Sequence, residues 1–537
     1  MWINHVTTIL RVFVLLGSVP VCMCVYAETL YGWVRGRVTP EAIVFQGIPY
    51  ASPPERWEHS QPPPRWVGVW DATQPRPMCF QPECGADEVP GVCLPQMSED
   101  CLFLNLYVPV DARPGGNKSV MVFIHGGGFE SYTAGADIYN GERFVNKGDV
   151  ILVTFNYRLG ALGFLVTGSG PGAAIGNYGI HDQRLALQWI KHNILNFGGD
   201  PEQVTLFGQS AGATSTAIHL TSGNAEHLFQ RAILQSAPFS IPFKTYEQAL
   251  DQGRSFSAEL GCPTQDFECM KQKSPMEIID AQKRTSTSTG TILQRFMPWA
   301  PHLDGNEVPL NLQSAFEMGV FVRKPVMLGT TANEGVPYIY KTFKAPLSRG
   351  AFSAMLFLLK PRDAMNLFLR YFPRNVADAR EEFSQLATDL VFTCPTRKIA
   401  RDLERRNATW LYVFDYPWKF LNTSRYVPYC KNKACHAAEI PFLFQSVHHG
   451  GFRLSMEDQH VADELLIYWT NFAKFENPNG DPTEEAVQNR TLSWPLYTSR
   501  GPFRFAGMVF KQPQSQVELD YFGVVCNAFD QNDFRAK

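Results

Sequence analysis

The chain has 537 residues, of which 45% are hydrophobic and 18% are charged, and its formal net charge is −3. This composition is typical of a globular protein with a large core. A nearly neutral chain without a dense basic run argues against nucleic acid as a partner. We find no repeat, low-complexity tract or flexible linker, and therefore expect one large domain.

The first 27 residues predict a secretory signal peptide. Arg11 precedes the short apolar run 12–19, and Val25 and Ala27 favour cleavage after Ala27. The apolar run is shorter than the roughly 20 residues that a membrane span needs, and no later stretch is long and apolar enough. The polar C-terminus carries neither a lipid-anchor tail nor a retention signal. We therefore expect a secreted mature domain of residues 28–537 without a membrane span.

Ten of the 12 cysteines and four glycosylation sequons follow the predicted leader. An even number of cysteines in a secreted chain predicts disulfides, and no CxxC pair indicates a zinc site. The sequons are expected to mark glycosylated surface loops, and they lie at Asn117, Asn407, Asn422 and Asn489. The cysteines are Cys79, Cys84, Cys93, Cys101, Cys262, Cys269, Cys394, Cys430, Cys435 and Cys526.

The elements predicted in the first third of the mature chain change in character near residue 120. The segment Tyr31–Trp70 is rich in Pro, Gly and Trp, and it predicts short antiparallel strands and turns. A further strand is expected at Leu102–Val108. Val120–Ile124 and Val150–Phe155 are continuous apolar runs, which are typical of strands buried on both faces of a parallel sheet. Asp182–Phe197 has the apolar spacing of a helix that packs on this sheet.

The later part of the chain continues the alternation of strands and helices. Strands are predicted at Val204–Phe207, Ala232–Gln235, Pro325–Gly329 and Trp410–Phe414, and a helix at Asp458–Phe475. Helical patterns dominate about 240–320 and 340–400, and we expect insertions that roof the C-terminal edge of the sheet, where α/β enzymes bind ligands. The pattern predicts an α/β fold with a mostly parallel central sheet flanked by helices and small N-terminal antiparallel strands.

The chain is organised around the segment 204–213, in which Ser210 lies between Gly208 and Gly212. An apolar strand precedes this G-x-S-x-G pattern and small residues that begin a helix follow it. The pattern is that of a nucleophile elbow, a sharp strand-to-helix turn that strains the serine backbone and exposes its hydroxyl. Ser210 is therefore the predicted nucleophile.

A serine hydroxyl needs a base to take its proton, and the base needs an orienting carboxylate. In this type of fold the carboxylate follows the serine and the histidine comes last. Of the seven histidines after Ser210, His436 is preferred because it begins a loop between a predicted strand and the apolar segment 440–444. Glu334 follows the strand that ends at Gly329, which predicts a place at the same sheet edge. The alternative interpretation of Glu334 is an exposed loop glutamate.

Three consecutive glycines follow the strand Val120–Ile124. Such a loop brings backbone N–H groups close to a developing oxyanion, although a plain glycine turn is the alternative. The predicted donors are the N–H groups of Gly127, Gly128 and Ala211.

Together these motifs resemble the type-B carboxylesterase/cholinesterase family over nearly all of the predicted mature chain. The matching segments are Phe45–Ala51, Ser98–Tyr107, Asn156–Gly160, Gly176–Gln183 and Phe197–Gly212. The resemblance implies an α/β-hydrolase fold, with Ser210 as nucleophile, His436 as general base and acid, and Glu334 as its orienting partner.

The family's disulfide plan implies the pairs Cys79–Cys101, Cys262–Cys269 and Cys394–Cys526. Cys84 with Cys93, and Cys430 with Cys435, then remain as extra pairs. The Cys430–Cys435 bond would close a small loop just before His436, and we expect it to stiffen the loop of the base.

Two departures from the family separate this chain from the cholinesterases. The family usually has Glu before the nucleophile, whereas this chain has Gln209, so a negative charge beside the triad is missing. Cholinesterases place a choline-binding tryptophan inside the first disulfide loop, and residues 79–101 contain none. Choline esters are therefore not expected as preferred substrates.

The expected function is a secreted, glycosylated serine esterase that cleaves small carboxylic esters through an acyl-enzyme, without a metal or organic cofactor. A lipase or a cholinesterase of the same family is the first alternative. The second is a catalytically silent adhesion protein of the neuroligin type, although such proteins typically lack the serine. Acyl and alcohol preference and oligomeric state are not predicted by the sequence.

Overall fold

The computed structural model describes residues 24–82, 91–263, 266–286, 290–359, 362–420, 423–481, 492–521 and 523–531. Residues 1–23 of the predicted leader, Cys84 and the sequons at Asn422 and Asn489 lie outside the described residues. Strand β1 (Cys24–Thr29) pairs along its whole length with β2 (Gly32–Val38). Cleavage after Ala27 would remove four of the six residues of β1.

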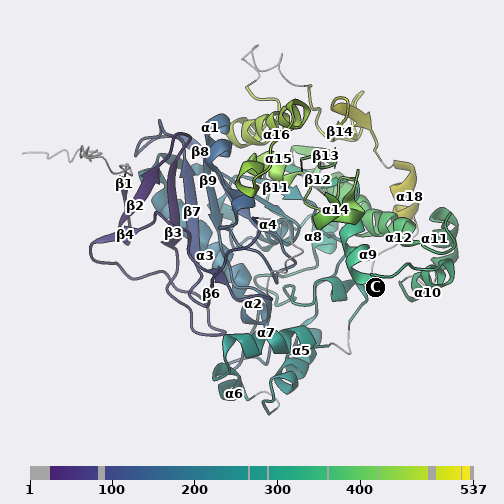
Figure 1. Ribbon diagram of the computed structural model, residues 1–537, viewed down its shortest axis with the longest axis horizontal. Helices are drawn as coiled ribbons and strands as arrows, with labels where there is room; N and C mark the ends of the chain where they lie inside the picture. The colour runs from purple at the N-terminus through teal and green to yellow at the C-terminus, as the bar shows by residue number, and fades with distance from the viewer. Residues whose placement is uncertain are drawn as a thin grey trace, which may run out of the picture.

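Among the described residues, 13 strands form one mixed sheet in the order β1-β2-β3-β7-β9-β8-β10-β11-β12-β13-β14-β15, with β4 beside β2 (Figure 1). Neighbouring strands are parallel from β9 to β14 and antiparallel at both ends, except that β4 pairs parallel with β2. This is the predicted mostly parallel sheet, and the α/β-hydrolase fold is confirmed.

All strands predicted from continuous apolar runs are present. The remaining bounds are β3 (Ile43–Pro49), β4 (Val69–Asp71), β7 (Phe103–Val108), β8 (Lys118–Ile124), β9 (Ile151–Phe155), β10 (Gly199–Gln209), β11 (Arg231–Gln235), β12 (Val326–Thr331), β13 (Thr409–Asp415), β14 (Ala506–Lys511) and β15 (Gln516–Leu519). Two short strands, β5 (Met78–Cys79) and β6 (Met97–Ser98), pair separately. Strands β14 and β15 were not predicted from the sequence.

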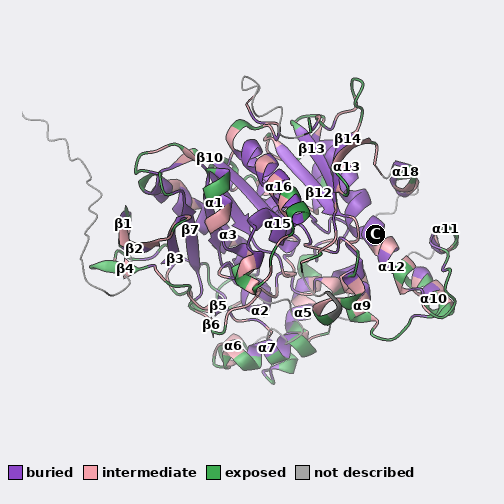
Figure 2. Ribbon diagram, turned by 45° about the horizontal axis from the view of Figure 1, so that its top comes forward, coloured by how far each residue is buried: buried purple, intermediate pink, exposed green. Residues whose placement is uncertain are grey.

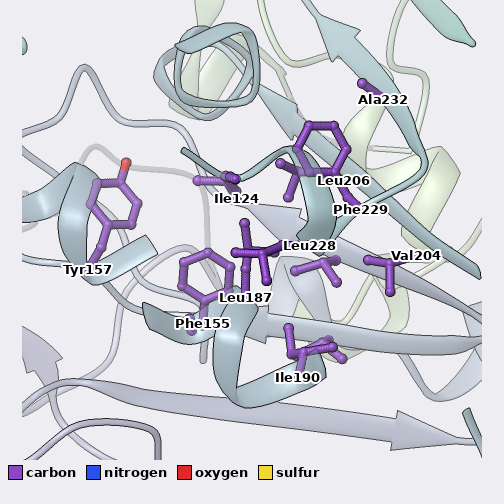
Figure 3. Packing of buried hydrophobic residues seen from close by; sticks show 14 of the residues in the cluster. Ile124, Phe155, Tyr157, Leu187, Ile190, Val204, Leu206, Leu228, Phe229 and Ala232 are labelled. Atoms are coloured by element: carbon purple, nitrogen blue, oxygen red, sulfur yellow. The ribbon is translucent and has the colours of Figure 1, made fainter. Parts of the chain in front are cut away.

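Successive residues of the central strands point into two different cores. On β8, Val122 and Ile124 belong to the core that contains Leu187 of α3 (Tyr178–Asn193), whereas Phe123 belongs to the core that contains Trp469 of α16 (Met456–Phe475). Figure 3 shows the first of these cores, where side chains from β8, β10 and α3 pack together. Burial on both faces explains why the cores of these strands are apolar at nearly every position.

The register brings the C-terminal ends of the central strands to one edge of the sheet. Gly208 of β10 lies opposite Ile124 of β8, and Gln235 of β11 lies opposite both Gln209 and Gly329. The segments that leave β8, β10 and β12 therefore begin beside one another. These are the segments that contain the predicted glycine loop, the nucleophile and the acid.

The segments 240–320 and 340–400 contain helices and no strand in their described residues, as predicted. Figure 1 shows α5–α7 below the sheet and α10–α12 beside its far end, and Figure 2 shows that many of their residues are exposed. Their bounds are α5 (Tyr246–Glu259), α6 (Phe267–Lys271), α7 (Pro275–Arg284), α8 (Leu312–Met318), α10 (Arg349–Leu359), α11 (Ala364–Arg370), α12 (Arg380–Ala387) and α13 (Cys394–Leu403), with a π-helical turn at Thr388–Thr393. The other helices are α1 (Glu142–Gly148), α2 (Gly160–Phe164), α4 (Ala211–Ser222), α9 (Val336–Thr342), α14 (Thr423–Tyr426), α15 (Ile440–Phe444) and α18 (Gly523–Gln531).

Four disulfides are formed in the described residues: Cys79–Cys101, Cys262–Cys269, Cys394–Cys526 and Cys430–Cys435. Cys93 is also disulfide-bonded. None of the described helices combines the length and apolar character that crossing a membrane requires.

The two described sequons differ in exposure. Asn117 is exposed on the loop between β7 and β8, whereas Asn407 is half-buried and both polar atoms of its side chain are shielded from solvent. A glycan on Asn407 would therefore require its side chain to turn outward.

Candidate active site

The predicted nucleophile lies in a sharp turn between β10 and α4. Ser210 has φ 58° and ψ −122°, a strained backbone conformation for a residue with a side chain. Its N–H donates to the Gln235 carbonyl at 2.8 Å. An added Cβ at Gly208 would lie 2.4 Å from the Gly212 backbone, and one at Gly212 would lie 1.9 Å from the Ile124 carbonyl oxygen. The turn therefore needs glycine on both sides of the serine.

The glycine loop after β8 lies next to this turn. Gly127 has φ 101°, and an added Cβ would lie 2.1 Å from the Ser131 carbonyl oxygen. The N–H groups of Glu130 and Ser131 both donate to the Gly127 carbonyl at 3.0 Å and hold the loop closed. The N–H groups of Gly127 and Gly128 have no acceptor among the described residues. Ala211 is the first residue of α4, where backbone N–H groups point out of the helix.

Glu334 and His436 are in direct contact. His436 Nδ1 lies 2.5 Å from Glu334 Oε2, and the Thr331 N–H donates to Glu334 Oε1 at 2.7 Å. The Glu334 side chain is fully buried, so it is not the exposed loop residue of the alternative interpretation. Because a carboxylate accepts the Nδ1 proton, the other ring nitrogen, Nε2, is left as the acceptor that a general base needs.

Backbone contacts join the loop of the acid to the loop of the base. The Asn333 N–H donates to the Ala434 carbonyl at 3.0 Å, and the Ala434 N–H donates to the Asn333 side chain at 3.1 Å. The Cys430–Cys435 disulfide ends directly before His436 and packs against Val336. The two loops therefore hold each other in place where their side chains meet.

The contacts on the Ser210 side of His436 were not predicted. The Gln209 side-chain nitrogen lies 3.0 Å from His436 Nε2. No hydrogen bond joins Ser210 to His436 among the described residues. The His436 ring packs against Tyr338 and Phe392, each with a centroid distance of 5.3 Å. The sequence marked Gln209 as unusual for the family, but it held no signal for Tyr338 or Phe392.

A second carboxyl group is buried beside the pair. Burial and the nearby negative charge of Glu334 raise the pKa of Glu439 to about 7. The Gln235 side chain donates to Glu439 Oε1 at 3.1 Å, whereas Glu439 Oε2 has no hydrogen-bond partner in the part of the chain that the structure describes. Glu439 is therefore protonated over a wider pH range than an ordinary glutamate.

A cavity of about 810 Å³ opens above these residues, and its lining includes Gly127, Gly128, Ser210 and His436. The roof predicted from the helical insertions is present. The first insertion contributes Leu293, Phe296 and Met297 to the walls, and the second contributes Met355, Leu359 and Phe392. The volume is that of a small-molecule site, and its walls are largely apolar.

Glu130 lies shortly after the glycine loop in the sequence, and its side chain lines the same cavity. Burial raises the pKa of Glu130 to about 7, although its hydrogen bond from Gln282 and the charge of Lys244 oppose the shift. A polar ligand group that reaches this part of the cavity would contact the Glu130 carboxyl, whose pKa lies close to neutral pH.

Residues 24–512 match the model of the Carboxylesterase family. The chain is 37% identical to "Crystal protein" of Dictyostelium discoideum over 522 residues, which cover 94% of this chain and 92% of that protein. It is 34% identical to acetylcholinesterase of Bungarus fasciatus, covering 91% of this chain and 85% of the relative. It is 29% identical to neuroligin-2 of Mus musculus, covering 95% of this chain and 66% of that protein.

Proposed function

Since the chain belongs to the carboxylesterase family, we propose that it is a secreted serine hydrolase that cleaves carboxylic esters through an acyl-enzyme on Ser210. The observation that carries the proposal is the 2.5 Å contact between Glu334 and His436, at the same sheet edge as the strained Ser210 turn. The expectation of secretion rests on the leader sequence, and that of glycosylation on the sequons.

In the proposed reaction, His436 Nε2 takes the proton of the Ser210 hydroxyl while the serine oxygen attacks the ester carbonyl. Glu334 accepts the Nδ1 hydrogen bond and stabilises the imidazolium that forms. The N–H groups of Gly127, Gly128 and Ala211 stabilise the oxyanion of the tetrahedral intermediate, because they are fixed before the charge develops. The imidazolium then protonates the leaving alcohol, and water hydrolyses the acyl-enzyme by the same sequence of steps.

The apolar cavity supports esters with a hydrophobic acyl or alcohol group. The two insertions provide many of its hydrophobic side chains, and the lining includes aromatic residues such as Phe296 and Phe392. The similarity to acetylcholinesterase keeps a cholinesterase as a candidate. Against it stand Gln209 and a first disulfide loop without tryptophan, since both features reduce the attraction for a quaternary ammonium.

A catalytically silent binding protein is the candidate from another class, and the similarity to neuroligin-2 is its support. The enzyme is favoured because the chain retains a serine in the strained turn, a buried acid bound to a histidine, and a glycine loop that lines the same cavity as the serine and the histidine. A protein that only binds partners does not need these three features together.

The proposal is tested by hydrolysis of short-chain and long-chain nitrophenyl esters, with Ser210→Ala as the matched variant. We expect an initial burst of nitrophenol and steady turnover in the wild type, and neither in Ser210→Ala. Equal activity in both proteins would contradict the proposal and favour the binding protein. The ratio of rates for short and long chains would measure the size of the acyl pocket.

A further inference from the structure

The ring nitrogen of His436 that is proposed to take the Ser210 proton, Nε2, already has a hydrogen-bond partner in this structure. The Gln209 side-chain nitrogen lies 3.0 Å from His436 Nε2, and Gln209 is 4% exposed. An amide nitrogen is only a donor, so Nε2 must be the acceptor of this hydrogen bond. The bond therefore uses the lone pair that has to take the Ser210 proton.

Ser210 is not hydrogen-bonded to this nitrogen. Among the described residues, no hydrogen bond joins the Ser210 hydroxyl to His436, whereas the Gln209 amide occupies Nε2. Direct proton transfer from Ser210 to Nε2 therefore requires that the bond from Gln209 is broken first.

The surroundings of Gln209 explain why its amide lies here. An added Cβ on Gly126 would lie 2.8 Å from the Gln209 side-chain oxygen and 3.1 Å from the Ser210 Cβ. The absence of a side chain at Gly126 thus leaves room for the amide between the glycine loop and the histidine. Gln209 also lines the cavity, so a ligand bound beside the glycine loop meets this amide.

We propose that Gln209 is a positioning residue that caps His436 Nε2 in the resting enzyme and has to be displaced before Ser210 can be acylated. This inference rests on the proposed function. The net free energy of one hydrogen bond between neutral groups corresponds to about a fivefold change in an equilibrium constant. Removal of the cap is therefore expected to accelerate acylation about fivefold.

Two substitutions separate the cap from the bulk of the side chain. Gln209→Met keeps an unbranched chain of similar length but has no N–H group. Gln209→Glu keeps the shape, and its carboxylate has no hydrogen to donate to a neutral imidazole. Gln203→Met is the matched control, because Gln203 lies on the same strand β10 but binds Ser119 and Asp200 instead.

The measurement is the rate of covalent labelling of Ser210 by a fluorophosphonate ester, extrapolated to saturating reagent, together with its half-saturating concentration. We expect both Gln209 variants to label about fivefold faster than wild type at saturation with little change in half-saturation. Gln203→Met should label like the wild type. The melting temperature of each variant shows whether it is folded.

An unchanged or slower maximal rate in folded Gln209→Met and Gln209→Glu would overturn the inference, because a purely supporting side chain can only slow the reaction when it is lost. In that outcome the wild type still labels and Ser210→Ala does not, so the proposed function stands. If the wild type and all Gln209 variants fail to label, the proposed function and the inference fall together.

Discussion

The C-terminal edge of the sheet and the two helical insertions contribute to the same cavity in different ways. At the edge, strand register, obligatory glycines and hydrogen bonds determine where Ser210, Glu334 and His436 lie. The insertions contribute hydrophobic side chains such as Phe296 and Met355. The rate of the reaction should therefore depend on residues at the edge, and the size of ligand that the cavity accepts should depend on residues of the insertions.

The cores of the two regions are also different. The residues at the edge follow strands whose side chains pack in the two cores of the sheet. Many insertion residues pack in a separate cluster that includes Leu293, Phe352 and Phe392. Because packing defects act mainly on contacting residues, changes in insertion walls that do not touch the edge should alter the cavity with little effect on the chemistry. Phe392 is the exception, because it packs against His436.

The largest expected effect is that of Glu334→Gln, which leaves the shape but removes the charge that orients and stabilises the imidazolium. We expect kcat to fall by about 10³- to 10⁴-fold for short and long esters alike. The measurement is steady-state hydrolysis of nitrophenyl esters. A loss confined to one chain length would contradict the assignment of Glu334 to the chemistry.

The second prediction compares alanine substitutions at two neighbouring glycines. A Cβ at Gly127 would lie 2.1 Å from the Ser131 carbonyl oxygen, whereas a Cβ at Gly128 meets no atom within 4 Å. Gly127→Ala should therefore distort the loop and lower kcat by about 10²- to 10³-fold. Gly128→Ala should lower it much less. Equal losses would show that the position of Gly127 is not what the oxyanion requires.

The third prediction concerns Glu439, whose pKa is raised to about 7 from an unfolded value near 4.5. The folded state then binds more protons than the unfolded state between these pH values, so stability falls as pH rises through this window. Glu439→Gln cannot ionise and should be more stable than wild type by about 1–3 kcal/mol at pH 8, with a smaller difference at pH 5. Thermal unfolding at both pH values measures it, and a pH-independent difference would contradict it.

In the insertions, Phe296→Ala should widen the cavity without touching the sheet edge. The ratio of kcat/KM for long and short esters should rise by on the order of 10-fold, mostly through KM. A fall in kcat for all chain lengths would contradict the separation of the two regions.

The smallest effect compares two disulfides that close loops of similar length. Cys430 and Cys435 are 5 residues apart beside His436, and Cys262 and Cys269 are 7 apart in the first insertion. Loss of either bond should lower the melting temperature similarly, because loop entropy depends weakly on length. Replacement of Cys430 and Cys435 by serine should also lower kcat about threefold, since the loop of the base loosens. Equal kcat in the two variants would refute the role of this bond.

Much of the sheet and of its edge could be predicted because the signals are local. Val120–Ile124 and Val204–Phe207 are apolar at nearly every position, which only strands buried on both faces require. Gly208 and Gly212 are needed by backbone geometry within one turn. By contrast, β14 and β15 are separated by the turn 512–515 within a polar stretch, and their pairing is not evident from apolar pattern alone.

Local sequence patterns predict the central strands, the strained serine turn and the glycine loop, because each depends on residues within a few positions of one another. The burial of Glu334, the insertion side chains that form the cavity and the contact between Gln209 and His436 follow only from the folded chain. Glu334 and His436 are 102 residues apart, and Gln209 and His436 are 227 apart. Contacts over such distances depend on the register of the sheet and on loop packing, which no local pattern encodes.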